Sequence, residues 1–201
     1  MTGEINSNIE RLELYSDEYP FNLSLRRSDF PDNKSLFRFV KNCERLIRNC
    51  PEYKDWRNYI FDVLGINSCS ISLEEKNEVS IEIHHHIPSL FMIVKTLVNK
   101  KISNNEEFSS FDICLETIIL HFQNKIGYIP IITSLHEKLH NGFLNIPIEL
   151  VKGNYKMFIK ELWEFIDDDD KKIIEERLSY NFENCSSFEW SKNKYPGVMT
   201  C

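Results

Sequence analysis

The chain of 201 residues is long enough for one hydrophobic core and short for two independent domains, and 42% of its residues are hydrophobic. Charged residues make up 27%, and glycine and proline are sparse, which excludes a disordered or fibrous protein. The formal net charge of −7 argues against a protein whose whole surface binds nucleic acid, although it leaves room for a local basic groove.

Composition also bears on the compartment. No segment has the run of about 20 apolar residues that a membrane span needs, and the polar N-terminal stretch lacks the apolar centre of a secretory signal. The six cysteines are scattered, and none forms the CxxC pair typical of zinc sites. We therefore expect a reduced, cytoplasmic protein without a membrane partner.

The first part of the chain is expected to be mainly helical. A short strand is a candidate at residues 11–15 (RLELY). Apolar residues then recur at helical spacing over residues 36–50. Pro51 ends that helix or begins the next, which runs to Gly65.

The period changes to two between residues 69 and 84. Residues 69–73 and 79–84 alternate between apolar and polar side chains around the polar turn EEKNE, which predicts a β-hairpin. In the second strand of this hairpin, Glu82 and His84 share the polar face.

Helices and one more strand are expected after Pro88, which closes the hairpin. Residues 90–98 and 111–122 carry amphipathic helical patterns, joined by a polar stretch. The apolar segment IGYIPII predicts a short strand, and the acidic run 167–170 is a solvated linker that also suits a helix N-terminus. A further helix is expected through residues 155–165.

A short helix is expected between that apolar strand and residue 142. Ser134 has Glu137 three residues later, which is the pattern of a capping box. Asn141 and Gly142 then indicate the end of the helix.

Histidines provide the strongest functional signal. Five of the six fall in two clusters, His84-His85-His86 and His136-x-x-x-His140. Positions i and i+4 share one helix face, so the second cluster can reach one metal ion together. A third imidazole from the strand would give three protein ligands and leave open positions, as in catalytic metal sites.

Plainer interpretations exist for the same residues. A HxxxH pair can simply lie on a solvent-exposed helix face, and three consecutive histidines can be exposed surface residues without a ligand. The ordered combination of strand, histidine cluster, proline and short helix favours the metal site. His121 lies within an amphipathic helical pattern and is expected to be structural.

The segments EIHHHIP and GYIPIITSLHEKLH together resemble the HNH, or His-Me finger, endonucleases, including phage-type HNH-related proteins. This resemblance implies a metal ion on His84, His136 and His140, with His85 as general base. It also implies that Glu82 supports the pair His84 and His85 on its own strand by fixing a tautomer and ring orientation. The implied cofactor is one divalent ion, Mg²⁺, Mn²⁺ or Zn²⁺.

The chain length and the helical patterns, taken with the resemblance over residues 68–147, predict an organisation, and the resemblance implies a substrate. The fold would be α+β and predominantly helical, a single domain over residues 1–201 with a small ββα-metal unit at about 68–147. Residues 89–126 would be a helical insertion in that unit, and residues 34–65 and 154–181 helical flanks. DNA is the implied substrate, with RNA as an alternative, and the site of action is the host cytoplasm if a phage encodes the protein.

Two departures or ambiguities concern single residues. Gly127 stands where the family places the Asn that orients the catalytic histidine, with Asn124 and Thr133 as candidate substitutes. Lys125 and Lys138 lie near the motif and are candidate phosphate contacts, or else solvated surface lysines.

Two other functions stay open on the sequence. One is an HNH-derived module without strong catalytic activity, kept for binding or assembly and holding a structural zinc. Its protein partner would bind the helical insertion or the flanks. The other is a metal-dependent hydrolase of a different substrate, because three histidines do not name a substrate.

Overall fold

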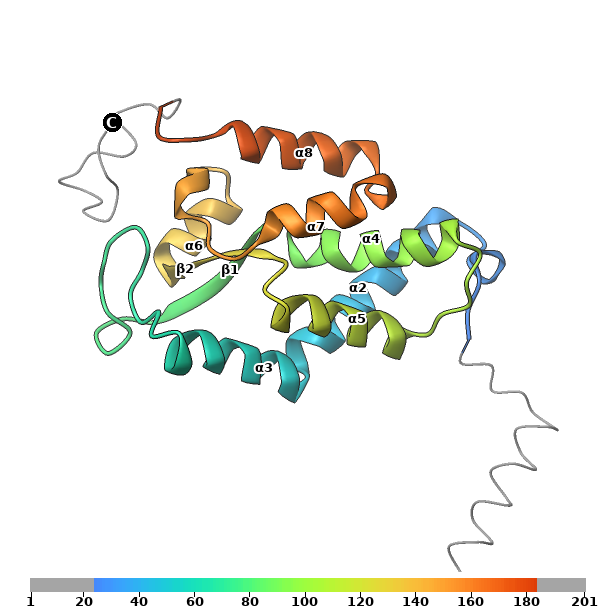
Figure 1. The fold of residues 1–201 in the computed structure, drawn as a ribbon, viewed down its shortest axis with the longest axis horizontal. Helices are drawn as coiled ribbons and strands as arrows, with labels where there is room; N and C mark the ends of the chain where they lie inside the picture. Colours follow the sequence, from blue (N-terminus) through green and yellow to red (C-terminus); the bar gives the residue numbers. More distant parts are fainter. Residues whose placement is uncertain (1–23, 184–201) are drawn as a thin grey trace, which may run out of the picture.

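The computed structural model describes residues 24–183, so the candidate strand at residues 11–15 lies outside the described residues. Helices dominate this part of the protein, and a two-stranded sheet lies toward one end of it (Figure 1). The expectation of a predominantly helical α+β fold is confirmed. The helices are α2 (Asn33–Asn49), α3 (Pro51–Asn58), α4 (Leu90–Ser103), α5 (Ser110–Phe122), α6 (Thr133–His140), α7 (Tyr155–Leu162) and α8 (Asp168–Ser179). The strands are β1 (Ile81–Ile87) and β2 (Gly127–Ile132).

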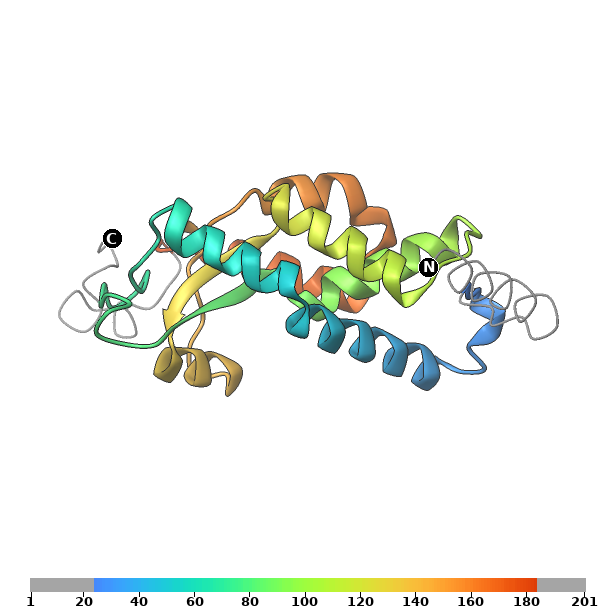
Figure 2. The same ribbon diagram turned by 90° about the horizontal axis from the view of Figure 1, so that it is seen from below.

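The first two helices begin and end at the residues that the sequence indicates. Asp32 caps α2 by accepting a hydrogen bond from the Ser35 backbone N–H at 2.6 Å. Pro51 occupies the first turn of α3, where its missing N–H costs nothing. A π-helical turn, Tyr59–Val63, extends α3 toward Gly65, whose φ of +64° suits glycine. Seen from below, α2 and α3 follow one another along the long axis of the molecule (Figure 2).

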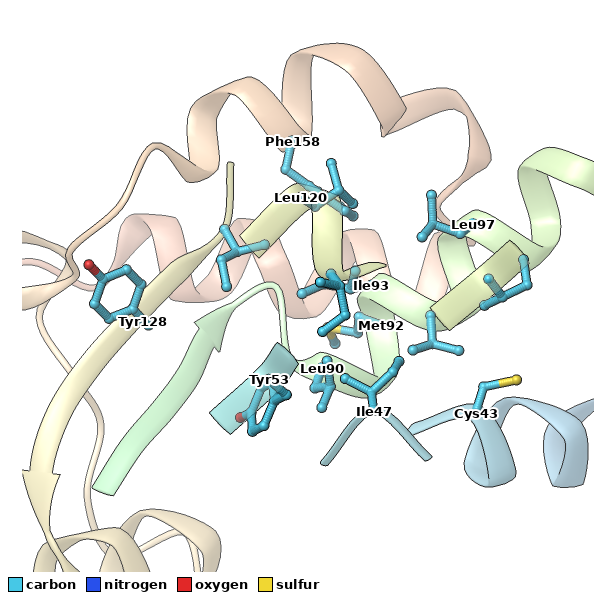
Figure 3. Close-up of a cluster of buried hydrophobic side chains, with 14 of the residues drawn as sticks. Cys43, Ile47, Tyr53, Leu90, Met92, Ile93, Leu97, Leu120, Tyr128 and Phe158 are labelled. Carbon is cyan, nitrogen blue, oxygen red and sulfur yellow. The ribbon is translucent and has the colours of Figure 1, made fainter. Parts of the chain in front are cut away.

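The main core forms around α4. This helix buries apolar side chains on most of its surface, as expected of a helix enclosed by other elements. Figure 3 shows Ile47 of α2, Ile93 of α4 and Phe158 of α7 within one cluster of buried side chains. This core fixes α4 and α5, the two helices that connect the strands.

The strand pairing differs from the expected hairpin. β1 pairs antiparallel with β2, with Ile81 opposite Ile132 and His85 opposite Tyr128. Residues 69–73 form turns instead of a strand, and the Ser70 N–H donates to the Pro130 carbonyl of β2 at 2.9 Å. The hairpin prediction was therefore wrong: its alternation reflects a turn segment that packs one apolar face beside β2.

Helix α6 follows β2 without a loop. It begins at Thr133 with Ile132 in the capping position, and no side chain caps it, so the predicted Ser134–Glu137 capping box was wrong. The direct passage from strand to helix leaves no polar residue at the cap position. The predicted end is confirmed, because α6 stops at His140 and Gly142 follows with φ +72°.

The acidic run 167–170 begins α8. Asp167 caps this helix by accepting from the Asp170 N–H at 3.0 Å. Lys95 of α4 forms ion pairs with Asp167 and, at 2.9 Å, with Asp170. The run is thus a helix N-terminus tied to the core, and only its middle residues are solvated.

Two general expectations can be compared with the described residues. Cys43, Cys50, Cys69 and Cys114 are free thiols. Within residues 24–183, no helix is both long and apolar enough to span a membrane. The single-domain organisation and the limits of the ββα unit stay predictions.

Candidate metal centre

Strand β1 and helix α6 bring three imidazoles together. His84 of β1, with His136 and His140 one turn apart on α6, can each offer a ligand atom within 4.8 Å of the other two. The Nε2 atoms of His136 and His140 lie 2.9 Å apart. Two nitrogens bound tetrahedrally to one zinc would lie roughly 3.3 Å apart, given the usual Zn–N distance. The three side chains therefore suit a single ion.

Local packing explains why these imidazoles face one another. Leu135 is buried beneath α6 and anchors the helix to a second, smaller apolar cluster beside β2. The other buried members of this cluster are Cys69, Ile71, Ile129, Ile131, Leu144 and Ile146. Helical spacing then places His136 and His140 together on another face. On β1, the two-residue period puts Glu82 on the same face as His84.

Glu82 supports the centre through His136. Its carboxylate accepts a hydrogen bond from His136 Nδ1, and Thr133 Oγ1 donates to Glu82 Oε1 at 3.2 Å. Because Nδ1 then carries the proton, the lone pair of His136 is on Nε2, the atom nearest His140. The imidazole that Glu82 contacts is thus His136, rather than the pair on its own strand.

Two imidazoles of the cluster, those of His84 and His140, are held in the neutral form. Burial, with smaller contributions from neighbouring histidines, lowers the pKa of His84 to about 2. Burial and the nearby His136 also lower the pKa of His140. Neutral imidazole is the form that binds a metal ion, so at neutral pH these ligands need lose no proton.

His85 lies on the other face of β1, away from the cluster. Only 5% of it is exposed, and its ring packs against Tyr53 and Trp56. Its Nε2 lies 2.8 Å from Nε2 of His121, and Nδ1 of His121 lies 2.7 Å from the Thr117 carbonyl oxygen. His85 nevertheless borders the same pocket as His84. Its role as general base stays a prediction.

The hydrogen bonds around His121 assign the tautomers of both rings. A carbonyl oxygen only accepts, so His121 Nδ1 must donate to Thr117, and its Nε2 is an acceptor when the ring is neutral. His85 Nε2 must then be the donor, which leaves the lone pair of His85 on Nδ1. Burial lowers the pKa of His85 well below its ordinary value and that of His121 to about 4, so both rings are neutral at pH 7.

The position of the missing Asn has no room for a side chain. A Cβ on Gly127 would lie 2.4 Å from the Ile87 carbonyl oxygen, because β1 and β2 approach closely there. Of the suggested substitutes, Thr133 contacts Glu82, and the backbone of Asn124 accepts from Asn154 N–H. The group that holds His85 is His121. The two histidines are 36 positions apart, and no pattern in the sequence indicated that they would be in contact.

The two lysines differ in their surroundings. Lys125 Nζ forms an ion pair with Glu161 of α7 at 2.7 Å, which already uses its charge. Lys138 is exposed on α6. Phosphate contacts by either residue stay a prediction.

A pocket of about 600 Å³ adjoins the cluster, between β1, the end of α6 and α8. His84 and His140 border it, together with His86 and Arg177. His86 is only 4% exposed, and neither ring nitrogen makes a full hydrogen bond. Burial, aided by Arg177, lowers its pKa to about 3, and the Ile146 backbone opposes this shift. From the sequence, no separate role was assigned to His86 and nothing pointed to Arg177, because periodicity does not show which helix covers β1.

Comparison with known proteins gives one result. A family model described as "Bacteriophage G278-like virion protein" matches residues 3–194. No curated protein and no solved structure was found to match the chain. The family match thus concerns virion proteins and not the HNH nucleases.

Proposed function

The chain therefore belongs to the Bacteriophage G278-like virion protein family, and we propose that its three-histidine centre serves metal-dependent hydrolysis of phosphodiester bonds in DNA. The observation that carries this proposal is the convergence of His84, His136 and His140 beside an open pocket. Three protein ligands leave coordination positions for water and a phosphate oxygen. Imidazole ligands suit Zn²⁺, whereas Mg²⁺ and Mn²⁺ prefer oxygen ligands.

In this proposal the chain's own residues have distinct tasks. The three ligands would hold the ion, and Glu82 keeps the His136 lone pair on Nε2. His85 would take the proton from water through Nδ1, the atom that its bond to His121 leaves unprotonated. A bound divalent ion would supply charge stabilisation at the leaving oxygen. We also propose that the protein acts in the host cytoplasm.

The test is nicking of supercoiled plasmid by the full chain with Mn²⁺, Zn²⁺ or Mg²⁺. His136→Ala should lose both metal binding and nicking. His85→Gln keeps a group that can donate to His121, so it should fold and bind metal while nicking falls about 100-fold or more. Glu137→Gln, an exposed change on α6, should leave both properties unchanged.

Each outcome is separable because metal binding is measured independently. Nicking that survives His85→Gln would remove His85 from the proposed mechanism, and His86→Gln would then be the next variant. Metal-bound protein that cleaves neither DNA nor RNA would overturn the nuclease proposal itself. Circular dichroism of each variant shows whether it is folded.

A second candidate is a structural zinc in a binding or assembly module. The observation in its favour is the burial of His85 behind β1, away from the three ligands. In that case the partner would be another protein, bound through α4 and α5 or the flanking helices. Stoichiometric zinc that resists dialysis against chelator, together with no cleavage, supports this candidate.

A further inference from the structure

Helix α8 places a cation at the pocket beside the metal centre. The Arg177 side chain is partly buried, and it donates a hydrogen bond from Nη1 to the backbone carbonyl of His86. This is its one side-chain hydrogen bond to residues 24–183. A guanidinium has five N–H donors, so most of them are left for another acceptor.

Arg177 also forms no salt bridge with a carboxylate in the described part of the chain, although the charges of Glu176 and Asp170 act on it from a greater distance. None of the ion pairs formed among residues 24–183 includes it. A partly buried cation without a carboxylate partner is costly unless an anion completes it. Glu176, the residue before it on α8, also borders the pocket; its side chain is exposed, and its charge acts on Arg177 without a salt bridge.

His86 provides an independent sign of a ligand. Its side chain is only 4% exposed and borders the same pocket. Neither Nδ1 nor Nε2 makes a full hydrogen bond. Buried polar atoms are rarely left unpaired. His86, with no full hydrogen bond at either nitrogen, and Arg177, with unused donors, therefore line one space.

We propose that this pocket binds a phosphate group, with Arg177 as its anchor and His86 as a hydrogen-bonding partner. Arginine recognises phosphate oxygens with two parallel N–H bonds. The volume of about 600 Å³ lies in the range of small-ligand sites. The inference rests on the proposed function and deepens it. His84 and His140 line this pocket, so a phosphate held there would lie beside the three-histidine cluster.

The same arrangement answers the objection from net charge. The chain is acidic overall, with a net charge of −7. Phosphate binding at one site depends on the local field, which Arg177 and a divalent ion on the neighbouring ligands would make positive. An acidic surface and a local anion site are therefore compatible.

The test measures binding of inorganic phosphate and of an eight-nucleotide single-stranded DNA to the full chain by calorimetry, with and without zinc. Arg177→Gln should weaken binding by about 10-fold or more, the value of a lost charge-assisted hydrogen bond. Arg177→Lys keeps the charge without the paired N–H groups and should give a smaller loss. Lys172→Gln, an exposed change on the same helix, should alter binding less than twofold.

A readout in the wild-type protein keeps the test valid if Arg177→Gln does not fold. The ¹⁵Nε–H signal of Arg177 should shift on titration with phosphate, and the signals of exposed arginines should not. An effect on both ligands indicates the DNA backbone as the source, and an effect on inorganic phosphate alone indicates free phosphate; either supports the site. Equal affinity of Arg177→Gln and the wild type, or no shift of the Arg177 signal, overturns it.

This test and the test of the proposed function fail separately. Phosphate binding through Arg177 without any nicking would leave the anion site standing and refute the nuclease proposal. Nicking with an unchanged KM in Arg177→Gln would support the nuclease proposal and refute the anion site.

Discussion

Replacing Glu82 with glutamine tests whether this carboxylate sets the metal affinity of the centre. Glu82 contacts His136 Nδ1 and accepts from Thr133 Oγ1 at 3.2 Å. Glu82→Gln keeps the shape and one acceptor oxygen but removes the charge that favours a donating Nδ1. The change therefore acts on the ligand His136 without touching the ion.

The size of the effect follows from exposure. Removing such a supporting carboxylate usually weakens metal binding 10- to 100-fold, or about 1.4–2.8 kcal/mol. Here the side chains of His136 and Glu82 are 22% and 37% exposed, so water screens their interaction in part. We therefore expect the lower end, about a 10-fold loss of zinc affinity.

The assay is competition with a chromophoric zinc chelator at pH 7.5. Glu137→Gln removes one negative charge from α6, the helix that carries His136 and His140, at an exposed position. It therefore controls for the general loss of charge. The reasoning is refuted if Glu82→Gln binds zinc within twofold of the Glu137→Gln control while His136→Ala abolishes binding.

Three further predictions concern stability, measured by urea unfolding. Burial lowers the pKa of His121 from 6.5 to about 4, so its neutral form stabilises the fold fully above pH 6.5 and less as the pH falls toward 4. With EDTA present, this loss should be on the order of 3 kcal/mol, and His121→Gln should show a smaller pH dependence; equal dependence would contradict it. Gly127→Ala should cost about 1–3 kcal/mol, because its Cβ would press on the Ile87 carbonyl; an unchanged urea midpoint would show that the strands can separate freely there. Asp167→Ala should cost about 1 kcal/mol through the lost cap of α8, and no loss would mean that the cap is not needed.

The sequence predicted the parts of the fold that depend on local pattern. Helical spacing located α2 and α5, and the i, i+4 rule brought His136 and His140 to one face. Two-residue alternation located β1 but not its partner, because two apolar segments could pair with it and periodicity does not choose between them.

The contacts of His85 and His86 with residues of distant helices were beyond the sequence for the same reason. His121 belongs to an ordinary buried helix face, and only the packing of α5 against β1 brings it to His85. Arg177 stands in a charged helix, and only the position of α8 over β1 brings it to the His86 carbonyl. The convergence of His84, His136 and His140 and a supporting role for Glu82 were predictable, whereas His121 and Arg177 were not.

The connection between the strands has a consequence for how the protein folds. Glu82 and His136 are 54 positions apart, and closing a flexible loop of that length costs roughly 3.5 kcal/mol in chain entropy before any constant. Packing of α4 against α5 shortens the effective loop, since both helices lie within it. The slow step in folding is then expected to be the long-range closure of β1 on β2, and the three imidazoles meet only once that closure is complete.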